Sequence, residues 1–295
     1  NVLVTVGAAE ANHIAIQTLI QPGDEIATVT PTYKQVWGIA ENLGAIVKPF
    51  ALDSRNNWAL DIDQLNAQVN ANTKVIAVVN PNNPTGHIFT EAEMNAVIAA
   101  ADRVGAWILA DEVYRGAERE QTHETYSFFG RYEKVIAIGS MSKAYGLPGL
   151  RVGWIVGPPD MVEDLWRRHE YSTITATMLS NHLAAHALSA QVRPRLIERA
   201  RKYIRGGYPV LQQWMDSQSG LFSYTPPQAS AVTFIRYNLD INSTDLMHKL
   251  IEETGVFVAA GDSFGMDKHL RIAFGQDKAV LEDAFSRIEG VLIKL

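Results

Sequence analysis

The stretch Val135-Ile-Ala-Ile-Gly139-Ser140-Met141-Ser142-Lys143 decides the fold class, because an apolar run leads directly into a cluster of polar side chains. Residues Val135–Gly139 are typical of a strand that is covered on both faces, as in a parallel sheet. A lysine that follows a strand is usually a solvated surface residue. Lys143 instead follows hydroxyl residues at the carboxyl end of a sheet strand, which is where open α/β folds bind their ligands.

The residues around Lys143 suit a ligand that carries both an aldehyde and a phosphate. A desolvated lysine amine has a lowered pKa and can form a Schiff base with an aldehyde. The hydroxyls of Ser140 and Ser142 can donate to an anion, and Arg151, eight residues after the lysine, can pair with it. The sequence therefore predicts an anion site beside an imine-forming amine.

Short β-branched runs alternate with helical patterns through the first two thirds of the chain. The helix between two of these runs has a capping box at Thr90 and Glu93, followed by apolar residues at helical spacing. Strand–helix–strand units of this length predict parallel pairing with right-handed crossovers, hence an α/β fold whose large domain has three layers, α/β/α, around a mainly parallel sheet. The expected strands are Val2–Val6, Glu25–Thr30, Lys74–Val79, Ala106–Ala110, Val135–Gly139 and Val152–Val156.

The pattern changes after about Met178. A long helical stretch from Leu179 to Ser217 is interrupted by Pro194 and by Gly206-Gly207. Strands near 231–237 and 270–274 and helices near 244–254 and 278–292 follow it. This texture predicts a smaller α+β domain over residues 195–295, after a large cofactor-binding domain over residues 1–194.

Composition excludes several classes of protein. The chain has 295 residues, 47% of them apolar, which is enough for a sizeable core. Its net charge of −6 and pI near 5.8 argue against nucleic-acid and anionic-membrane partners. No apolar run approaches the roughly 20 residues of a membrane-spanning helix. The absence of cysteine excludes disulfides, thiolate metal sites and a cysteine nucleophile, and favours a cytoplasmic location.

Two further features bear on the start of the chain and on metal binding. The chain begins with Asn1 and enters a strand pattern at once, so we expect further residues upstream in the natural protein. His182 and His186 have the i, i+4 spacing of a metal pair, but no acidic ligand accompanies them. We therefore predict no metal site.

Two further polar motifs follow apolar runs. Asn80-Pro-Asn-Asn-Pro-Thr-Gly86 comes after Lys74–Val79, and taken alone it is an ordinary turn. Asp111-Glu-Val-Tyr114 comes after Ala106–Ala110, and taken alone it is an ordinary helix start. Because the carboxyl ends of parallel strands meet at one edge of a sheet, both motifs and the Lys143 cluster are expected to converge on one crevice.

As a set, these motifs resemble those of the pyridoxal-phosphate-dependent aminotransferases of fold type I, class I/II. The resemblance runs from Val2 to the end of the chain, and it rests on the Asn-Pro-Thr-Gly turn, Asp111 with Tyr114, Ser140-x-x-Lys143, and Arg151. It implies a pyridoxal 5'-phosphate cofactor, a homodimer, and a ping-pong exchange of an amino group between an amino acid and a 2-oxo acid.

The resemblance also implies catalytic roles. Lys143 matches the lysine that forms the Schiff base with the cofactor and then moves the substrate's proton. Asp111 matches the carboxylate that faces the pyridine nitrogen and keeps it protonated. Asn83 and Tyr114 match the pair that hydrogen-bonds the 3-hydroxyl oxygen of the ring.

Binding roles follow in the same way. Ser140 and Arg151 match phosphate ligands, with Ser142 as a weaker candidate. Gly7-Ala8-Ala9-Glu10 leads into a helix expected from about Ala11 to Leu19, and such a turn presents free N–H groups to an anion. Family members often have a hydroxyl residue at the position of Ala9, so here only the backbone amides of Ala8 and Ala9 remain as donors.

Two aromatic or basic side chains complete the implied site. Tyr33, after the strand Glu25–Thr30, matches the aromatic ring that stacks on the pyridine. Arg271 matches the arginine that binds the substrate α-carboxylate with two hydrogen bonds, and Asn83 is expected beside it. Taken alone, Arg271 is an edge-strand arginine paired with a surface acid.

One position bears on the substrate side chain. In aspartate-type members an arginine for the distal carboxylate lies about thirty-four residues after the lysine, and Thr177 occupies that place here. The resemblance therefore favours an amino donor with a neutral or aromatic side chain.

Two other functions stay open. The same core motifs occur in relatives that catalyse β-elimination or cyclisation, because the reaction depends on which Cα bond is perpendicular to the ring. Some transcription regulators carry an aminotransferase-like domain as an effector sensor behind a DNA-binding segment, which would lie upstream of this sequence.

Overall fold

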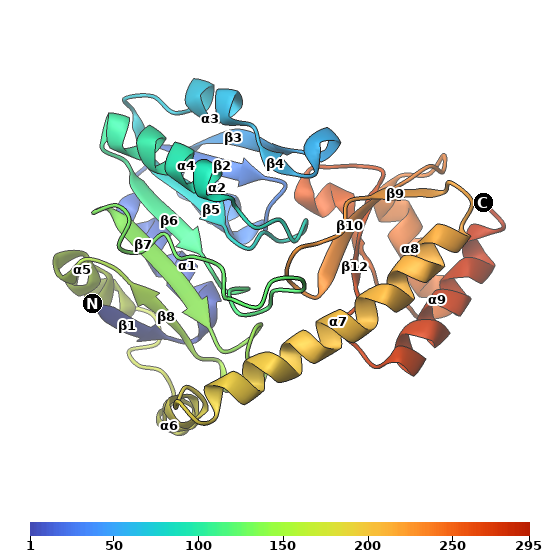
Figure 1. Cartoon of the computed structure of the whole chain (residues 1–295). Coiled ribbons are helices and arrows are strands. Elements are labelled where there is room, and N and C mark those ends of the chain that lie inside the picture. Colours follow the sequence, from blue (N-terminus) through green and yellow to red (C-terminus); the bar gives the residue numbers. More distant parts are fainter.

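The computed structural model describes all 295 residues, and a large mixed sheet spans residues 2–156 (Figure 1). The strand order is β1 (Val2–Thr5), β8 (Gly153–Val156), β7 (Val135–Ser140), β6 (Trp107–Asp111), β5 (Thr73–Val79), β2 (Glu25–Thr30), β3 (Ile46–Asp53) and β4 (Ala59–Leu60). Pairing is parallel from β7 through β6, β5 and β2 to β3, and antiparallel at β1, β8 and β4. The predicted mainly parallel α/β sheet is therefore confirmed.

Helices cover both faces of this sheet, as the three-layer prediction requires. One face carries α1 (Gly7–Leu19), α2 (Gln35–Asn42) and α5 (Pro159–His169), and the other carries α3 (Ile62–Gln68) and α4 (Glu91–Val104). Alternate residues of β6 point to these two faces: Leu109 packs in the same core as Ile14 of α1, whereas Ile108 packs in the same core as Met94 of α4. The capping box predicted at Thr90 and Glu93 is present at the start of α4.

A second, antiparallel sheet lies in the last third of the chain. Its core includes Trp214 and Phe285, whose rings stack with centroids 4.7 Å apart. The sheet order is β11 (Ala259–Ala260), β12 (His269–Ala273), β10 (Val232–Tyr237) and β9 (Phe222–Tyr224), and its helices are α7 (Arg193–Ser217), α8 (Ser243–Thr254) and α9 (Lys278–Leu292). The predicted boundary after residue 194 falls in the first turn of α7 and stays a prediction.

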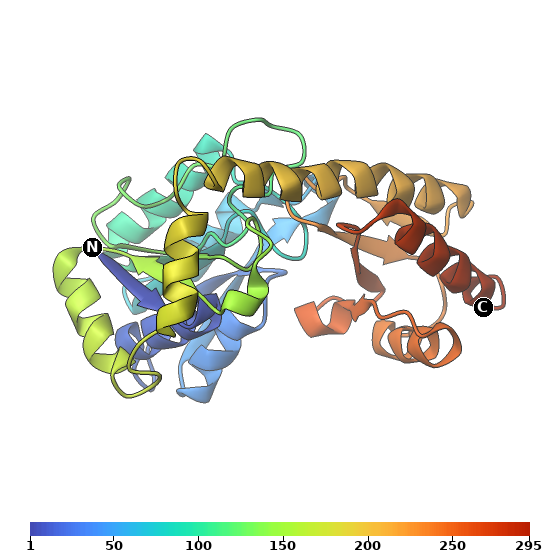
Figure 2. The same ribbon diagram turned by 90° about the horizontal axis from the view of Figure 1, so that it is seen from below.

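Helix α7 corrects the sequence analysis. It runs without interruption for 25 residues and connects the two halves of the molecule (Figure 2), so the break expected at Gly206-Gly207 is wrong. A Cβ on Gly207 would lie 1.8 Å from the carbonyl oxygen of Phe274, so this glycine allows close packing rather than ending the helix. Pro194 sits in the first turn, where proline is tolerated, and α6 (Met178–Ala187) is a separate helix before it.

The sequence analysis also missed elements near the edge of the large sheet, namely α2, β3, β4, α3 and α5. Strand β3 contains Lys48 and Pro49, so it lacks the apolar run that marks the central strands. Helix α1 begins at Gly7, one turn earlier than expected. Short 3-10 helices cover Ser54–Asn56, Pro148–Leu150 and Gly261–Phe264. None of the helices combines the length and the apolar character needed to cross a membrane.

Candidate active site

A pocket of about 370 Å³ opens at the carboxyl ends of four neighbouring strands, β7, β6, β5 and β2. The expected convergence of the motifs on one crevice is therefore observed. Which of these residues bind cofactor or substrate stays a prediction at this point. The lining includes all eleven residues that the sequence analysis selected: Ala8, Ala9, Tyr33, Asn83, Asp111, Tyr114, Ser140, Ser142, Lys143, Arg151 and Arg271.

The amine of Lys143 lies over an aromatic ring at the wall of the pocket, although the residue as a whole is exposed. Its Nζ is 5.7 Å from the centroid of the Tyr114 ring. Burial lowers the pKa of Lys143 and the positive charge of Arg271 lowers it further, while Asp111 acts in the opposite direction. Because the neutral amine is the nucleophilic form, this environment favours attack by Lys143 on a carbonyl carbon.

Asp111 ends β6 and is almost fully buried, with 5% of its surface exposed. Its Oδ2 accepts a hydrogen bond from Asn12 Nδ2 at 2.9 Å, and its Oδ1 accepts one from the Val113 N–H at 3.2 Å. Burial raises the pKa of Asp111, whereas these hydrogen bonds and the charge of Lys143 oppose the rise. The site thus contains a carboxylate held within the protein and available to a cationic partner.

Sequence reasoning did not select Asn12, which is 1% exposed and also lines the pocket. The available signal was a polar residue on the apolar face of α1, between Ala11 and Ile14. Such a residue is a candidate for a buried polar contact, but nothing in the sequence names its partner. The other lining residues that were not selected are Gln35, Val79, Val113 and Pro148.

The first turn of α1 forms the anion end of the pocket. Gly7 has φ +79°, and a Cβ there would lie 2.4 Å from Nη2 of Arg151, so only glycine lets the guanidinium approach this turn. Arg151 also has a positive φ, of 51°, and its Nη1 donates to the Pro148 carbonyl at 2.9 Å. The first N–H groups of a helix have no partner within it, so Ala8 and Ala9 can donate to an anion.

Arg271 reaches this pocket from the second sheet. Its Nη1 donates to Oδ1 of Asn83 at 3.0 Å, which joins β12 to the turn after β5. Arginine has five N–H donors in a planar fork, so donors remain for a carboxylate. The pocket has two aromatic lining residues, Tyr114 and Tyr33, and Tyr33 is nearly half exposed.

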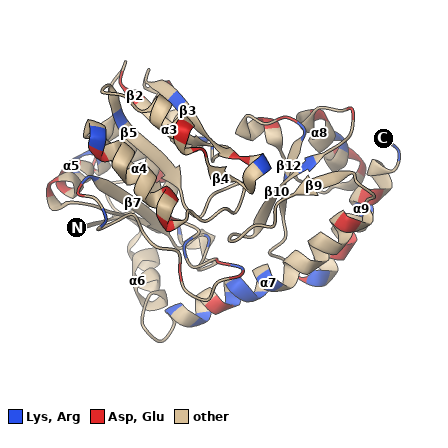
Figure 3. Ribbon diagram, turned by 45° about the horizontal axis from the view of Figure 1, so that its top comes forward, with Lys and Arg blue, Asp and Glu red and all other residues tan.

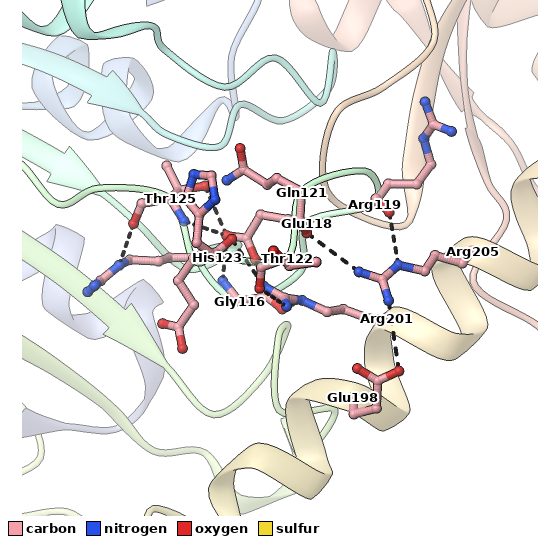
Figure 4. A network of polar contacts seen from close by, with 12 residues as sticks. Gly116, Glu118, Arg119, Gln121, Thr122, His123, Thr125, Glu198, Arg201 and Arg205 are labelled. Carbon is pink, nitrogen blue, oxygen red and sulfur yellow. Dashed lines mark hydrogen bonds and ion pairs between the residues drawn. The ribbon is translucent and has the colours of Figure 1, made fainter.

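A network of polar contacts fixes the loop that follows Tyr114 to α7 (Figure 4). Glu118 is fully buried and pairs with Arg201, and its Oε1 accepts hydrogen bonds from the N–H groups of Gly116 at 2.9 Å and Thr125 at 2.8 Å. One turn further along α7, Arg205 Nε donates to the Arg119 carbonyl at 2.9 Å. The blue segments of α7 in Figure 3 include these arginines.

This network bears on the site through one close contact. A Cβ on Gly116 would lie 3.1 Å from Cβ of Ala144, the residue after Lys143. The loop carrying Tyr114 therefore packs directly on the segment carrying Lys143. By attaching this loop to α7, the network helps to hold the Tyr114 ring at its position beside the Lys143 amine.

The donor set fits pyridoxal 5'-phosphate. The group carries an aldehyde, a pyridine nitrogen and a phosphate. The pocket offers an amine with a lowered pKa, a buried carboxylate, and a helix start at which glycine leaves room for an arginine. Its volume is also within the range usual for cofactor sites, about 300–1,000 Å³.

Comparisons with known proteins agree with this geometry. The family model "Aminotransferase class I and II" matches residues 1–288. The capreomycidine synthase of Streptomyces vinaceus is 31% identical, over 97% of this chain and 73% of the relative, and an aspartate aminotransferase of Streptomyces avermitilis is 27% identical, over 99% and 74%. A PLP-dependent aminotransferase from Streptococcus suis has a TM-score of 0.92 at 31% identity, over 99% of this chain and 77% of that one.

Proposed function

The chain belongs to the class I and II aminotransferases, a pyridoxal-phosphate-dependent family, and from this premise we propose that it transfers an amino group from an α-amino acid to a 2-oxo acid in two half-reactions. One observation carries the proposal: Lys143, Asp111 and Arg271 line a single pocket from two different sheets. The cofactor supplies an electron sink that stabilises negative charge at the substrate Cα.

We assign the proton transfers to Lys143. Its Nζ would hold the cofactor through an imine and, when free, would accept the proton from the substrate Cα and donate it back. The lowered pKa of Lys143 suits this role, because a base must be neutral before it can accept a proton. Asp111 would pair with the ring nitrogen of the cofactor and keep it protonated.

Tyr114 and Asn83 are assigned as hydrogen-bond donors to the 3-hydroxyl oxygen of the cofactor ring. Burial raises the pKa of Tyr114 to about 12, so the phenol keeps its proton at neutral pH and acts as a hydrogen-bond donor. The amide of Asn83 can donate to the same oxygen while its Oδ1 accepts from Arg271. Tyr33, which lines the pocket and is partly exposed, would stack on the ring.

The phosphate is assigned to the first turn of α1. The proposed donors to the phosphate are the N–H groups of Ala8 and Ala9, the guanidinium of Arg151 and the hydroxyls of the two serines. All of these residues line the pocket, the serines being Ser140 and Ser142. The Ser140 hydroxyl already accepts the N–H of Ser142 at 3.2 Å, so its own proton is available for a phosphate oxygen. Ser142 therefore contributes chiefly by orienting Ser140.

Arg271 is assigned to the substrate α-carboxylate, which makes α-amino acids rather than simple amines the substrate class. Thr177, at the start of α6, is exposed and carries no charge. A cationic partner for a distal carboxylate is thus missing at this position, which supports an amino donor with a neutral or aromatic side chain.

Cyclisation is a second candidate. The relative at 31% identity is named a synthase, capreomycidine synthase, rather than a transferase. The residues proposed to hold the cofactor suit transamination and cyclisation equally. Which of the two reactions occurs would depend on the bound substrate and on which of its Cα bonds is perpendicular to the ring.

We further propose a cytoplasmic homodimer that buries the segment around α6. Tyr171, Met178 and Leu179 are 93%, 85% and 69% exposed, which is unusual for large apolar side chains so close in the sequence. Replacing Met178 and Leu179 by glutamate should give a monomer in sedimentation velocity. Phe257→Glu is the control, because Phe257 is as exposed as Leu179 but lies outside this segment. A wild-type protein that sediments as a monomer would contradict the proposed dimer.

The proposed cytoplasmic location is tested separately, by subcellular fractionation.

The reaction is tested with the holoprotein and a panel of amino acids. We expect each accepted amino acid to convert the bound cofactor to its amine form, and a 2-oxo acid to restore the aldehyde form, both followed by absorbance. A product that keeps all its nitrogen, with no amine form of the cofactor, would instead support cyclisation. Failure of wild-type protein to bind the cofactor would contradict both candidates.

A further inference from the structure

Asn12 contacts the site through one atom only. Its Nδ2 donates to Asp111 Oδ2, while its Oδ1 is buried and has no hydrogen-bond partner. The NH₂ group is the part of Asn12 that faces Asp111, which suits the ionised carboxylate because that form can only accept hydrogen bonds. The single contact that fixes this amide is therefore Asp111.

This arrangement does not stabilise the helix. Asparagine is a poor residue for a helix interior, and an amide oxygen that is buried without a partner costs free energy. The neighbours of Asn12 on α1, Ala11 and Ile14, are apolar and fully buried, so a leucine would suit the surroundings. A residue that disfavours folding and touches Asp111 is better explained by the site than by the fold.

The geometry points to Asn12 as a positioning residue that holds Asp111 as the acceptor for the pyridine nitrogen of the cofactor, an inference that rests on the proposed function. The Asp111 carboxylate has two oxygens, and the Val113 N–H holds one of them. With Asn12 on the other oxygen, rotation of the carboxyl group is blocked and its charged form is favoured. Asn12 itself then acts through Asp111 and does not need to touch the reacting atoms.

The test compares two probes in the full chain, wild type and Asn12→Leu. Pyridoxal phosphate carries the ring nitrogen, whereas in 1-deazapyridoxal phosphate a C–H group replaces it. Both are titrated into cofactor-free protein and their dissociation constants are read from protein fluorescence. Since a hydrogen bond to a charged group is lost, we expect the preference for pyridoxal phosphate over the deaza probe to fall about tenfold in Asn12→Leu.

The thermal midpoint of the cofactor-free protein provides the second readout. We expect Asn12→Leu to equal or exceed wild type, because an unpartnered buried amide has been removed. Thr18→Val, which removes a hydroxyl from the same helix far from Asp111, should leave the preference unchanged. An equal loss of affinity for both probes, or an unchanged preference, would overturn the inference. If wild-type protein binds neither probe, the proposed function itself fails.

Discussion

The two halves of the molecule contribute to the pocket in different ways. The large half, built around the eight-stranded sheet, supplies ten of the eleven selected residues, and its backbone N–H groups at the start of α1 form the predicted anion site. The small half is built around the four-stranded sheet. The small sheet supplies only Arg271, which meets the large half through a side-chain hydrogen bond to Asn83. A cofactor bound by one rigid sheet would stay in place, while a substrate that bridges both sheets would bring them together.

The largest effect is expected from removing the anchor in the large half. Lys143→Ala removes the amine that bonds to the cofactor aldehyde, so borohydride treatment should leave no cofactor covalently attached. Mass spectrometry of the digested protein measures this directly. Lys202→Ala, which removes an exposed lysine of α7, should label like wild type. A reduced lysine–cofactor adduct in Lys143→Ala would rule out the assignment.

The second prediction concerns Asp111→Ala, which removes the buried carboxylate of the pocket. Removing one partner of a buried ion pair costs about 4 kcal/mol, so the rate of Cα proton removal should fall about 10³-fold. The measurement is single-turnover loss of deuterium from a Cα-deuterated amino acid. Near-normal turnover would refute the proposed pairing with the ring nitrogen.

The large half should also lose stability in acid through Glu93. Burial by itself would raise the pKa of Glu93. The hydrogen bond and the electrostatic interaction with His87, together with hydrogen bonds from the N–H groups of Leu60 and Thr90, lower this pKa to about 2. A carboxyl whose pKa is lowered in the folded state stabilises it above the unfolded pKa, and this contribution disappears as the pH falls toward 2.

We therefore expect Glu93→Gln to lower the free energy of unfolding by about 3 kcal/mol at pH 7. The difference should shrink below about pH 4.5, where the unfolded chain takes up the proton. Urea unfolding at several pH values measures it. A difference that does not change between pH 7 and pH 3 would show that Glu93 acts by packing alone.

The smallest effect concerns the small half. Gly207→Ala places a methyl group against the Phe274 carbonyl and should cost about 2 kcal/mol, whereas Gly206→Ala, with nothing within 4 Å, should stabilise α7 by up to about 1 kcal/mol. Thermal unfolding of both variants is the measurement. Equal behaviour of the two variants would mean that α7 does not pack closely on this segment.

The central strands and the pocket-lining residues that follow them could be predicted from sequence, because buried parallel strands are continuous apolar runs. Asp111 and Lys143 each follow such a run, so strand order alone brings them together. The imine-forming amine and the anion site beside it were predicted from the residues around Lys143. The roles of Asp111 and Arg271 came from the family resemblance.

Long-range contacts explain what sequence could not provide. Gly207 looks like a helix break until its contact with Phe274 is seen. Asn12 looks like a stray polar residue until Asp111, 99 positions away, is found beside it. Strand β3 lies near the edge of the sheet and contains Pro49, so it lacks the signal of its buried neighbours.

The division of labour between the halves is tested most directly by two measurements on Arg271→Lys. Lysine keeps the charge but loses the planar fork, so kcat/KM for amino acids should fall about 10²-fold. The dissociation constant of pyridoxal phosphate should stay at the wild-type value, because the large half is intact. An unchanged kcat/KM, or an equal loss in cofactor affinity, would contradict the account.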